Sequence, residues 1–110
     1  MLHKSQRLSR SEFTHYFSLG TRIHDPAITL IYSPGDNFKA SVVVGKKVAK
    51  KAVTRNTFRR QIYGLLAEYV TRGISPGIYI VITKPAFSVL SKSARTTVIR
   101  EILARSSKPR

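Results

Sequence analysis

Residues 45–60 carry seven cationic side chains and no carboxylate, and the acid-free stretch around them extends from Asn37 to Ala67. A helical pattern begins inside this segment at about Thr54. A helix N-terminus already carries partial positive charge, which disfavours each nearby cation by about 0.3–1 kcal/mol. The exposed amides and the surplus of cations therefore indicate an anion site, with phosphate as the expected anion and a polyphosphate backbone as the expected ligand. The cations are Lys46, Lys47, Lys50, Lys51, Arg55, Arg59 and Arg60.

The charge of the whole chain points the same way, because it is +15 over 110 residues. Such a field favours nucleic acid as a partner and makes an anionic membrane surface the second choice. A hydrophobic content of 42% separates the chain from disordered basic tails and suits one domain, residues 1–110, with one modest core. We expect flexible ends at about 1–6 and 106–110. The lack of cysteine, of a signal peptide and of a membrane span fits a reducing cytoplasm.

Local signals predict the first two helices. Ser9 and Glu12 have the spacing of a capping box, which predicts a helix over 10–19 that ends at Gly20. A second helix is expected over about 54–71, with an apolar stripe for the core and a neighbouring polar arc about 100° wide. The arc holds Asn56, Arg59, Arg60 and Tyr63.

The ends of the second helix are predicted from neighbouring residues. Val53 and Phe58 have the spacing of a hydrophobic staple around Thr54 as the N-cap, and Gly73 is the expected terminator. This placement starts the helix within the basic segment. A third helix is expected to begin at Ser91 or Ser93.

The strand pattern completes the fold class. The segment 39–45 is predicted to pair antiparallel with 27–32 across a turn, and 78–83 is apolar enough to lie centrally. The order helix, strands, helix, strand, helix predicts an α+β sandwich with one small sheet and helices mainly on one face. The four predicted strands are 22–24, 27–32, 39–45 and 78–83.

Several aromatic and polar residues allow two interpretations each. Phe13, Tyr16 and Phe17 lie on one helix face, either as core or as a half-exposed platform for unpaired bases, and both hold if Phe13 and Phe17 line a cleft. Asn56 is either a first-turn polar residue or an RNA contact. Tyr63 is either a packing residue at the stripe edge or a ring beside the phosphate path.

The sequence contains no pattern that predicts catalysis by the protein. It has no phosphate-binding loop, dinucleotide fingerprint or nucleophile elbow, and its five acids are far apart. His3, His15 and His24 do not recur at ligand spacing. We therefore expect no catalytic residue and no metal site, and we expect any chemistry to belong to a partner.

Four motifs follow one another along nearly the whole chain. They are Arg7-Leu8-Ser9 with Glu12-Phe13, Phe17 and Gly20; Val44-Gly45-Lys46-Lys47-Val48; Lys51-Ala52-Val53-Thr54-Arg55-Asn56 with Arg59-Arg60; and Pro76-Gly77-Ile78-Tyr79-Ile80-Val81-Ile82. In combination they resemble the protein subunit of bacterial ribonuclease P, the small basic partner of a catalytic RNA. The chain differs from that pattern at Thr57, which replaces an arginine, at Gly45, which replaces a serine, and at Tyr63-Gly64, which replace polar residues.

The resemblance implies a four-stranded sheet with three helices in the order α-β-β-β-α-β-α, as in the second domain of ribosomal protein S5. It also implies a left-handed βαβ crossover made by 39–45, the helix over 54–71, and 78–83. Sequence physics alone would predict a right-handed crossover.

The resemblance further implies a role in removing the 5′ leader of precursor tRNA. The RNA subunit would perform the hydrolysis, with Mg²⁺ held by RNA and substrate, and one protein would bind each RNA, away from any membrane. Phe13 and Phe17 would lie in a cleft for the single-stranded leader. Phosphates of RNA would be met by Lys46, Lys47, Lys50, Lys51, Arg55, Asn56, Arg59 and Arg60.

Two other functions stay open from the residues alone. A structural RNA-binding protein of ribosomal type, with no cleavage role, would have the same composition. A protein-only nuclease is disfavoured by the sparse acids, because metal-dependent hydrolysis needs clustered carboxylates.

Overall fold

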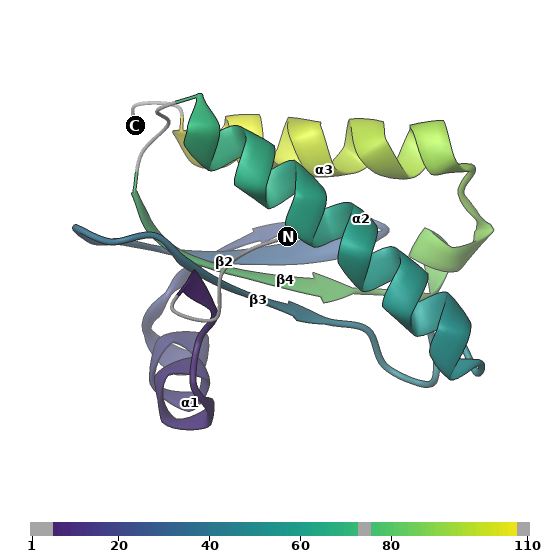
Figure 1. Ribbon diagram of the computed structural model, residues 1–110, viewed down its shortest axis with the longest axis horizontal. Helices are drawn as coiled ribbons and strands as arrows, with labels where there is room; N and C mark the ends of the chain where they lie inside the picture. The colour runs from purple at the N-terminus through teal and green to yellow at the C-terminus, as the bar shows by residue number, and fades with distance from the viewer. Residues whose placement is uncertain (1–5, 73–75, 108–110) are drawn as a thin grey trace.

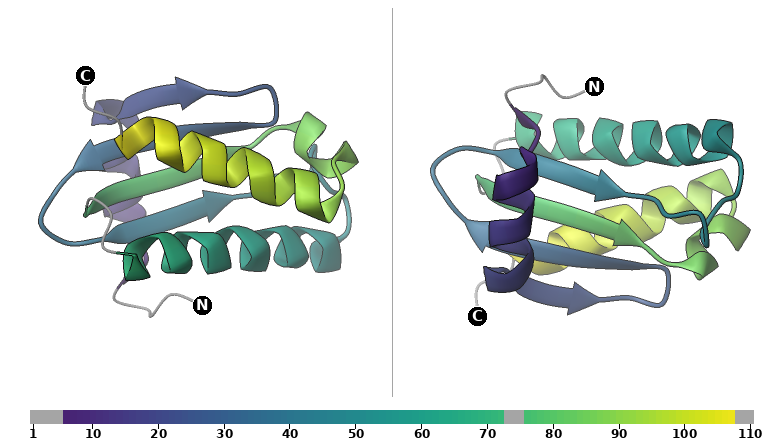
Figure 2. Two further views of the ribbon diagram at one scale, coloured as in Figure 1. Left: turned by 90° about the horizontal axis from the view of Figure 1, so that it is seen from above. Right: turned by 90° about the horizontal axis from the view of Figure 1, so that it is seen from below.

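The computed structural model describes residues 6–72 and 76–107 and shows one sheet between two layers of helix (Figure 1). Helices α2 and α3 cover one face, and α1 crosses the other face near one end of the strands (Figure 2). The predicted α+β sandwich is confirmed, with two of its three helices on one face. The elements are α1 (Arg10–Leu19), β1 (Thr21–His24), β2 (Ile28–Pro34), β3 (Lys39–Val43), α2 (Ala52–Thr71), β4 (Gly77–Thr83), the 3₁₀ helix η2 (Pro85–Val89) and α3 (Lys92–Ser107).

The sheet has the order β1-β2-β4-β3, so the predicted antiparallel pairing of 39–45 with 27–32 is wrong. Strand β4 lies between those two strands, antiparallel to β2 and parallel to β3. Its residues Ile78–Val81 are almost fully buried, because helices cover both of its faces and strands cover both of its edges. The central position predicted for 78–83 is confirmed.

Strands β3 and β4 with α2 between them form the βαβ unit. The left view of Figure 2, from the side of α2 and α3, shows both strands pointing to the right with β4 above β3. When the view is turned so that the strands point upward, β4 lies to the left of β3. The crossover is therefore left-handed, as the family resemblance implied and against the usual right-handed preference.

Helix α1 begins and ends where the sequence predicts. The Ser9 hydroxyl accepts the Glu12 N–H, and a Glu12 carboxylate oxygen accepts the Ser9 N–H, which completes the capping box. Gly20 follows the helix with φ −70°, so it does not use the left-handed conformation expected of a terminating glycine. Its role is close packing instead, because a Cβ there would collide with Cγ2 of Ile31.

Helix α2 starts at Ala52, two residues before the predicted start, so Thr54 is not its N-cap. Lys51 is the N-cap and makes no side-chain capping bond. The expected staple is also wrong, since 75% of Val53 is exposed. The expected terminator Gly73 lies outside the described residues, and the helix ends with Arg72 as its C-cap.

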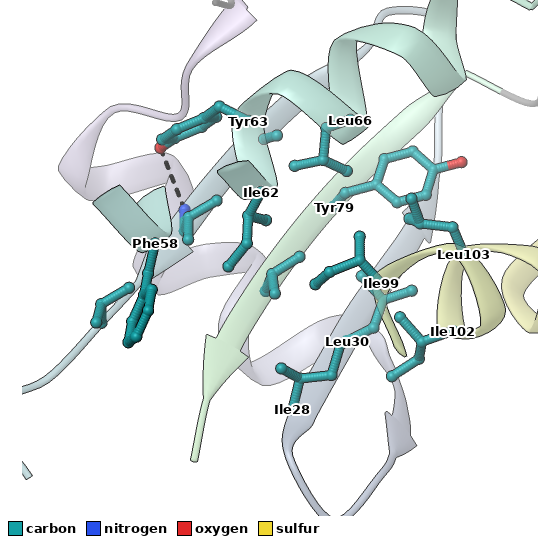
Figure 3. Packing of buried hydrophobic residues seen from close by; sticks show 14 of the residues in the cluster. Ile28, Leu30, Phe58, Ile62, Tyr63, Leu66, Tyr79, Ile99, Ile102 and Leu103 are labelled. Carbon is teal, nitrogen blue, oxygen red and sulfur yellow. Dashed lines mark hydrogen bonds between the residues drawn. The ribbon is translucent and has the colours of Figure 1, made fainter. Parts of the chain in front are cut away.

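The main core lies between the sheet and the pair α2 and α3 (Figure 3). Among its largest buried side chains are Ile62 and Leu66 from α2, Ile99 and Leu103 from α3, and Tyr79 from β4. The apolar stripe predicted for the second helix thus faces the sheet. This packing fixes which side of α2 is left for a ligand.

The two ends of helix α3 can be compared with the sequence predictions. Ser91 is the capping serine, since its hydroxyl accepts the N–H of Ala94. The helix continues to Ser107, into the segment 106–110 that was expected to be flexible. No helix in the described part of the chain is long and apolar enough to span a membrane.

Candidate nucleic-acid interface

The turn between β3 and α2 presents four exposed lysines. Buried Val48 fixes the turn to the core, and its N–H donates to the carbonyl of Gly45 at 3.1 Å. With no side-chain cap on Lys51, the first amides of α2 point outward beside these lysines. The arrangement is a strongly positive helix end that can bind phosphate. The exposed lysines are Lys46, Lys47, Lys50 and Lys51.

Arg55 turns back toward this loop. Its Nη1 donates to the carbonyl oxygens of Ala49 at 3.0 Å and Lys50 at 2.7 Å. The guanidinium is half-buried, so its contacts hold the lysine turn against the helix. This geometry gives Arg55 a positioning role in addition to the phosphate contact predicted for it.

The polar arc of α2 forms the floor and wall of a hollow of about 390 Å³, here called the α2 hollow. Asn56 accepts a 2.7 Å hydrogen bond from Nη1 of Arg59, which orients that guanidinium. The structure thus brings together all four residues predicted for the arc and adds a fifth from another element. The α2 hollow is lined by Arg7, Asn56, Arg59, Arg60 and Tyr63.

Arg7 was missed by sequence reasoning as a member of this site, because it lies far from α2 along the chain. A bridge between Arg7 and Ala40 of β3 brings it to the open edge of the sheet, and Leu8 donates its N–H to the Ala40 carbonyl at 3.1 Å. The Arg7 guanidinium carbon then lies 5.2 Å from the centroid of the Tyr63 ring. A cation over an aromatic face is held by the ring quadrupole.

Tyr63 combines the two roles that the sequence left open. Its side chain is buried, and its hydroxyl accepts the N–H of Val42 at 3.2 Å (Figure 3). Because β3 is an edge strand, this bond satisfies an amide that has no strand partner. Its ring also lines the α2 hollow, so Tyr63 both packs against the sheet and borders the cationic site.

On the opposite face of the sheet, α1 places the two predicted phenylalanines together. Their rings stack at 5.6 Å between centroids with an interplanar angle of 30°. Phe13 packs against the small cluster of Ile31, Ile78 and Ile80, whereas Phe17 is 37% exposed. The core interpretation therefore fits Phe13, and the platform interpretation fits Phe17.

Arg22 of β1 contacts Phe17 and was not predicted to belong to this site. Its guanidinium carbon lies 4.6 Å from the centroid of the Phe17 ring. Its Nη2 donates to the backbone carbonyl of Phe17 at 2.9 Å, which fixes the guanidinium over the end of α1. Phe13, Phe17 and Arg22 are called the Phe17 stack below.

The carboxylates lie away from the basic segment. Lys39 donates to Glu12 at 2.6 Å, and this contact with the capping bonds of Ser9 lowers the pKa of Glu12 to about 2. Glu68 pairs with Arg72 and Arg100. Within residues 6–72 and 76–107, no cation of the segment 45–60 forms an ion pair with a carboxylate. These cations keep their charge for an external anion.

Comparison with known proteins identifies the family. The Ribonuclease P family model matches residues 2–107. The ribonuclease P protein component of Nitratiruptor is 31% identical over 77 residues, covering 70% of this chain and 69% of that protein. That of Pseudanabaena is 32% identical over 87 residues, covering 76% and 74%. The chain belongs to the ribonuclease P protein family.

Solved ribonuclease P proteins share the fold. The protein from Staphylococcus aureus superposes with a TM-score of 0.85 over 94% of this chain and 96% of its own, at 19% identity. The protein from Thermotoga maritima gives 0.78 over 90% and 96%, at 20% identity. These likenesses confirm the fold with its left-handed crossover at low sequence identity.

Family membership makes this chain the protein component of a tRNA-processing ribonuclease that associates with a ribonuclease P RNA. It confirms the resemblance and sets aside the structural ribosomal alternative. The described residues contain no group of three or more His, Asp or Glu side chains that could hold a metal ion.

Proposed function

We propose that this chain binds RNA on two faces and so promotes endonucleolytic removal of the 5′ leader from precursor tRNA. The lysine turn and the α2 hollow bind phosphates of the ribonuclease P RNA. The Phe17 stack, on the opposite face of the sheet, receives the single-stranded leader. The observation that carries the proposal is the acid-free cationic cluster at the start of α2, joined by Arg7 from the N-terminal segment.

The chemistry supports phosphate as the ligand of the first face. Arginine guanidinium groups match phosphate oxygens in two-point hydrogen bonds, and lysines supply mobile point charges. Asn56 holds Arg59 in place, which reduces the ordering cost when RNA binds. Each neutralised phosphate releases counterions, so binding by this face is expected to weaken steeply with salt.

Stacking supports a leader at the second face. Base–aromatic stacking contributes about 1–3 kcal/mol per base and tolerates any base, because each has a π face. A protein that serves many precursors needs that tolerance, since their leaders differ. The half-exposed ring of Phe17 suits such contacts, with Phe13 behind it.

The division of labour assigns the hydrolysis to the RNA subunit, with Mg²⁺ held by RNA and substrate. One protein bound to each RNA, in the cytoplasm, completes the proposal. The protein then acts by positioning the leader and by neutralising phosphates that would otherwise repel one another.

The test is cleavage of precursor tRNA at low Mg²⁺ by a bacterial ribonuclease P RNA, with and without this protein. We expect 5′ cleavage that needs the RNA, is restored by the protein, and is absent with protein alone. Tight RNA binding without restored cleavage, repeated with the cognate RNA, would contradict the proposal. Cleavage by protein freed of RNA would show that the proposal assigns the chemistry to the wrong partner.

A further inference from the structure

We infer that Arg22 is the group on which a leader base stacks, with the Phe17 ring as its support. This inference rests on the proposed function, because it concerns the leader face. It assigns to β1 a contact that the helix residues Phe13 and Phe17 were expected to make alone.

The register of the sheet brings Arg22 to the leader face. Arg22 is the cross-strand partner of Ile31, and residues opposite each other in a ladder point to the same face. Ile31 belongs to the cluster beneath α1, so Arg22 emerges on the α1 side of the sheet. α1 crosses this face near one end of the strands and leaves the rest of it without a helix (Figure 2).

Two contacts fix the position of the Arg22 guanidinium. The 4.6 Å approach to the Phe17 centroid places it over the ring, and the 2.9 Å bond to the Phe17 carbonyl prevents it from swinging away. Phe17 already stacks with Phe13, so its ring has two neighbours. A base that approaches over the side covered by Arg22 meets the guanidinium and not the ring.

The chemistry of the guanidinium suits this role. It is planar, delocalised and weakly hydrated, and RNA-binding proteins stack bases on arginine planes as well as on aromatic rings. Arg22 is exposed, and among the described residues the only hydrogen bond of its side chain is the one to Phe17. Its other guanidinium N–H groups stay available for a leader phosphate or a base edge. One side chain can therefore supply both stacking and charge.

A lysine at this position separates stacking from charge. Arg22→Lys keeps the cation but has no plane, so we expect the holoenzyme to bind precursor tRNA about 5-fold or more weakly, the low end of base stacking. Binding of mature tRNA is expected to stay unchanged. The matched control is Arg10→Lys, which makes the same replacement at an exposed arginine of α1 outside the Phe17 stack. Thermal melting checks that both variants fold.

The decisive measurement is a double-mutant cycle with precursors that carry one abasic nucleotide, moved along the leader. At one leader position we expect the abasic nucleotide to weaken precursor binding by the wild-type holoenzyme. At that position it should have little further effect on binding by the Arg22→Lys holoenzyme. Full affinity of Arg22→Lys, or equal abasic penalties in both proteins at every position, would overturn the inference. If the wild-type holoenzyme bound precursor and mature tRNA equally well, the proposed function itself would be overturned. This outcome is distinguishable from failure of the inference about Arg22, which is seen in the comparison of wild type with Arg22→Lys.

Discussion

The α2 hollow and the Phe17 stack each contain an arginine packed on an aromatic ring, but the ring is buried in the first and exposed in the second. In each, an arginine lies over an aromatic ring, at 5.2 Å for Arg7 on Tyr63 and at 4.6 Å for Arg22 on Phe17. Tyr63 is buried and tied to the sheet, whereas Phe17 is half-exposed at the end of a short helix. A buried ring holds its cation for phosphates, and an exposed ring lets the pair meet a base.

Charge density separates the two regions as well. Around α2, cations from one turn, one helix and the N-terminal segment gather without a carboxylate. At α1, Glu12 pairs with Lys39, and the Phe17 stack holds a single cation, Arg22. The first region is therefore expected to respond to salt and the second to the presence of bases.

The largest effect is expected from Arg59→Ala combined with Arg60→Ala. Loss of two phosphate contacts is expected to weaken binding to the ribonuclease P RNA. The slope of log K against log salt is negative, and its magnitude is expected to decrease by about 2. Affinities measured across a salt series test this. Arg72→Ala with Arg100→Ala removes the same charge beside Glu68 and serves as the control. An unchanged slope in the Arg59→Ala, Arg60→Ala variant would show that these two arginines do not contact RNA phosphates.

Phe17→Ala is expected to act on the other region alone. The change removes the ring under Arg22 and is expected to reduce the preference for precursor over mature tRNA by about 1–3 kcal/mol. Affinity for the RNA subunit and its salt slope are expected to stay near wild type. Because 37% of Phe17 is exposed, we expect the variant to fold. Unfolding seen by circular dichroism would mean that Phe17 is core, against the platform interpretation.

Tyr63→Phe tests how far the α2 hollow depends on its support. The ring and its contact with Arg7 remain, but the Val42 N–H loses its acceptor. An unsatisfied buried donor costs about 1–3 kcal/mol, so the free energy of unfolding is expected to fall by that amount. Denaturant titration gives this quantity. The salt slope of RNA binding is expected to stay the same, and a smaller slope would show that the cations of the α2 hollow lose phosphate contacts when the Tyr63 support is weakened.

Sequence patterns predicted the elements and the cationic arc because their causes are local. A capping box sets the start of α1, and helical periodicity sets which side of α2 meets the core. The same periodicity placed Asn56, Arg59, Arg60 and Tyr63 on one arc, which the structure confirms as the wall of the α2 hollow.

Contacts between distant segments could not be predicted from local patterns. The pairing of β3 with β4 depends on α2 folding back across the sheet, and no turn signal records it. The start of α2 is set by buried Val48 and by Arg55 on the loop carbonyls, which override the better local cap at Thr54. Arg7 and Arg22 reach their rings only through strand register.

The smallest effect is expected from Glu12→Gln and concerns how α1 is held. The ion pair with Lys39 and the capping bonds lower the pKa of Glu12 from 4.5 to about 2. Because the pKa of Glu12 is lower in the folded protein than in the unfolded chain, its carboxylate stabilises the fold at pH values above the unfolded pKa. That contribution is lost as the pH falls from about 4.5 towards 2. Glutamine can keep the capping bond but not the charge.

Melting curves over this pH range compare wild type, Glu12→Gln and the control Glu101→Gln. We expect Glu12→Gln to melt lower than wild type near neutral pH, and the gap to close as acid protonates Glu12. The control is expected to follow wild type, because Glu101 forms no ion pair among the described residues. A gap that stays constant down to about pH 2 would show that the ion pair with Lys39 does not stabilise the fold, and that α1 is held by its other contacts, including the packing of Phe13.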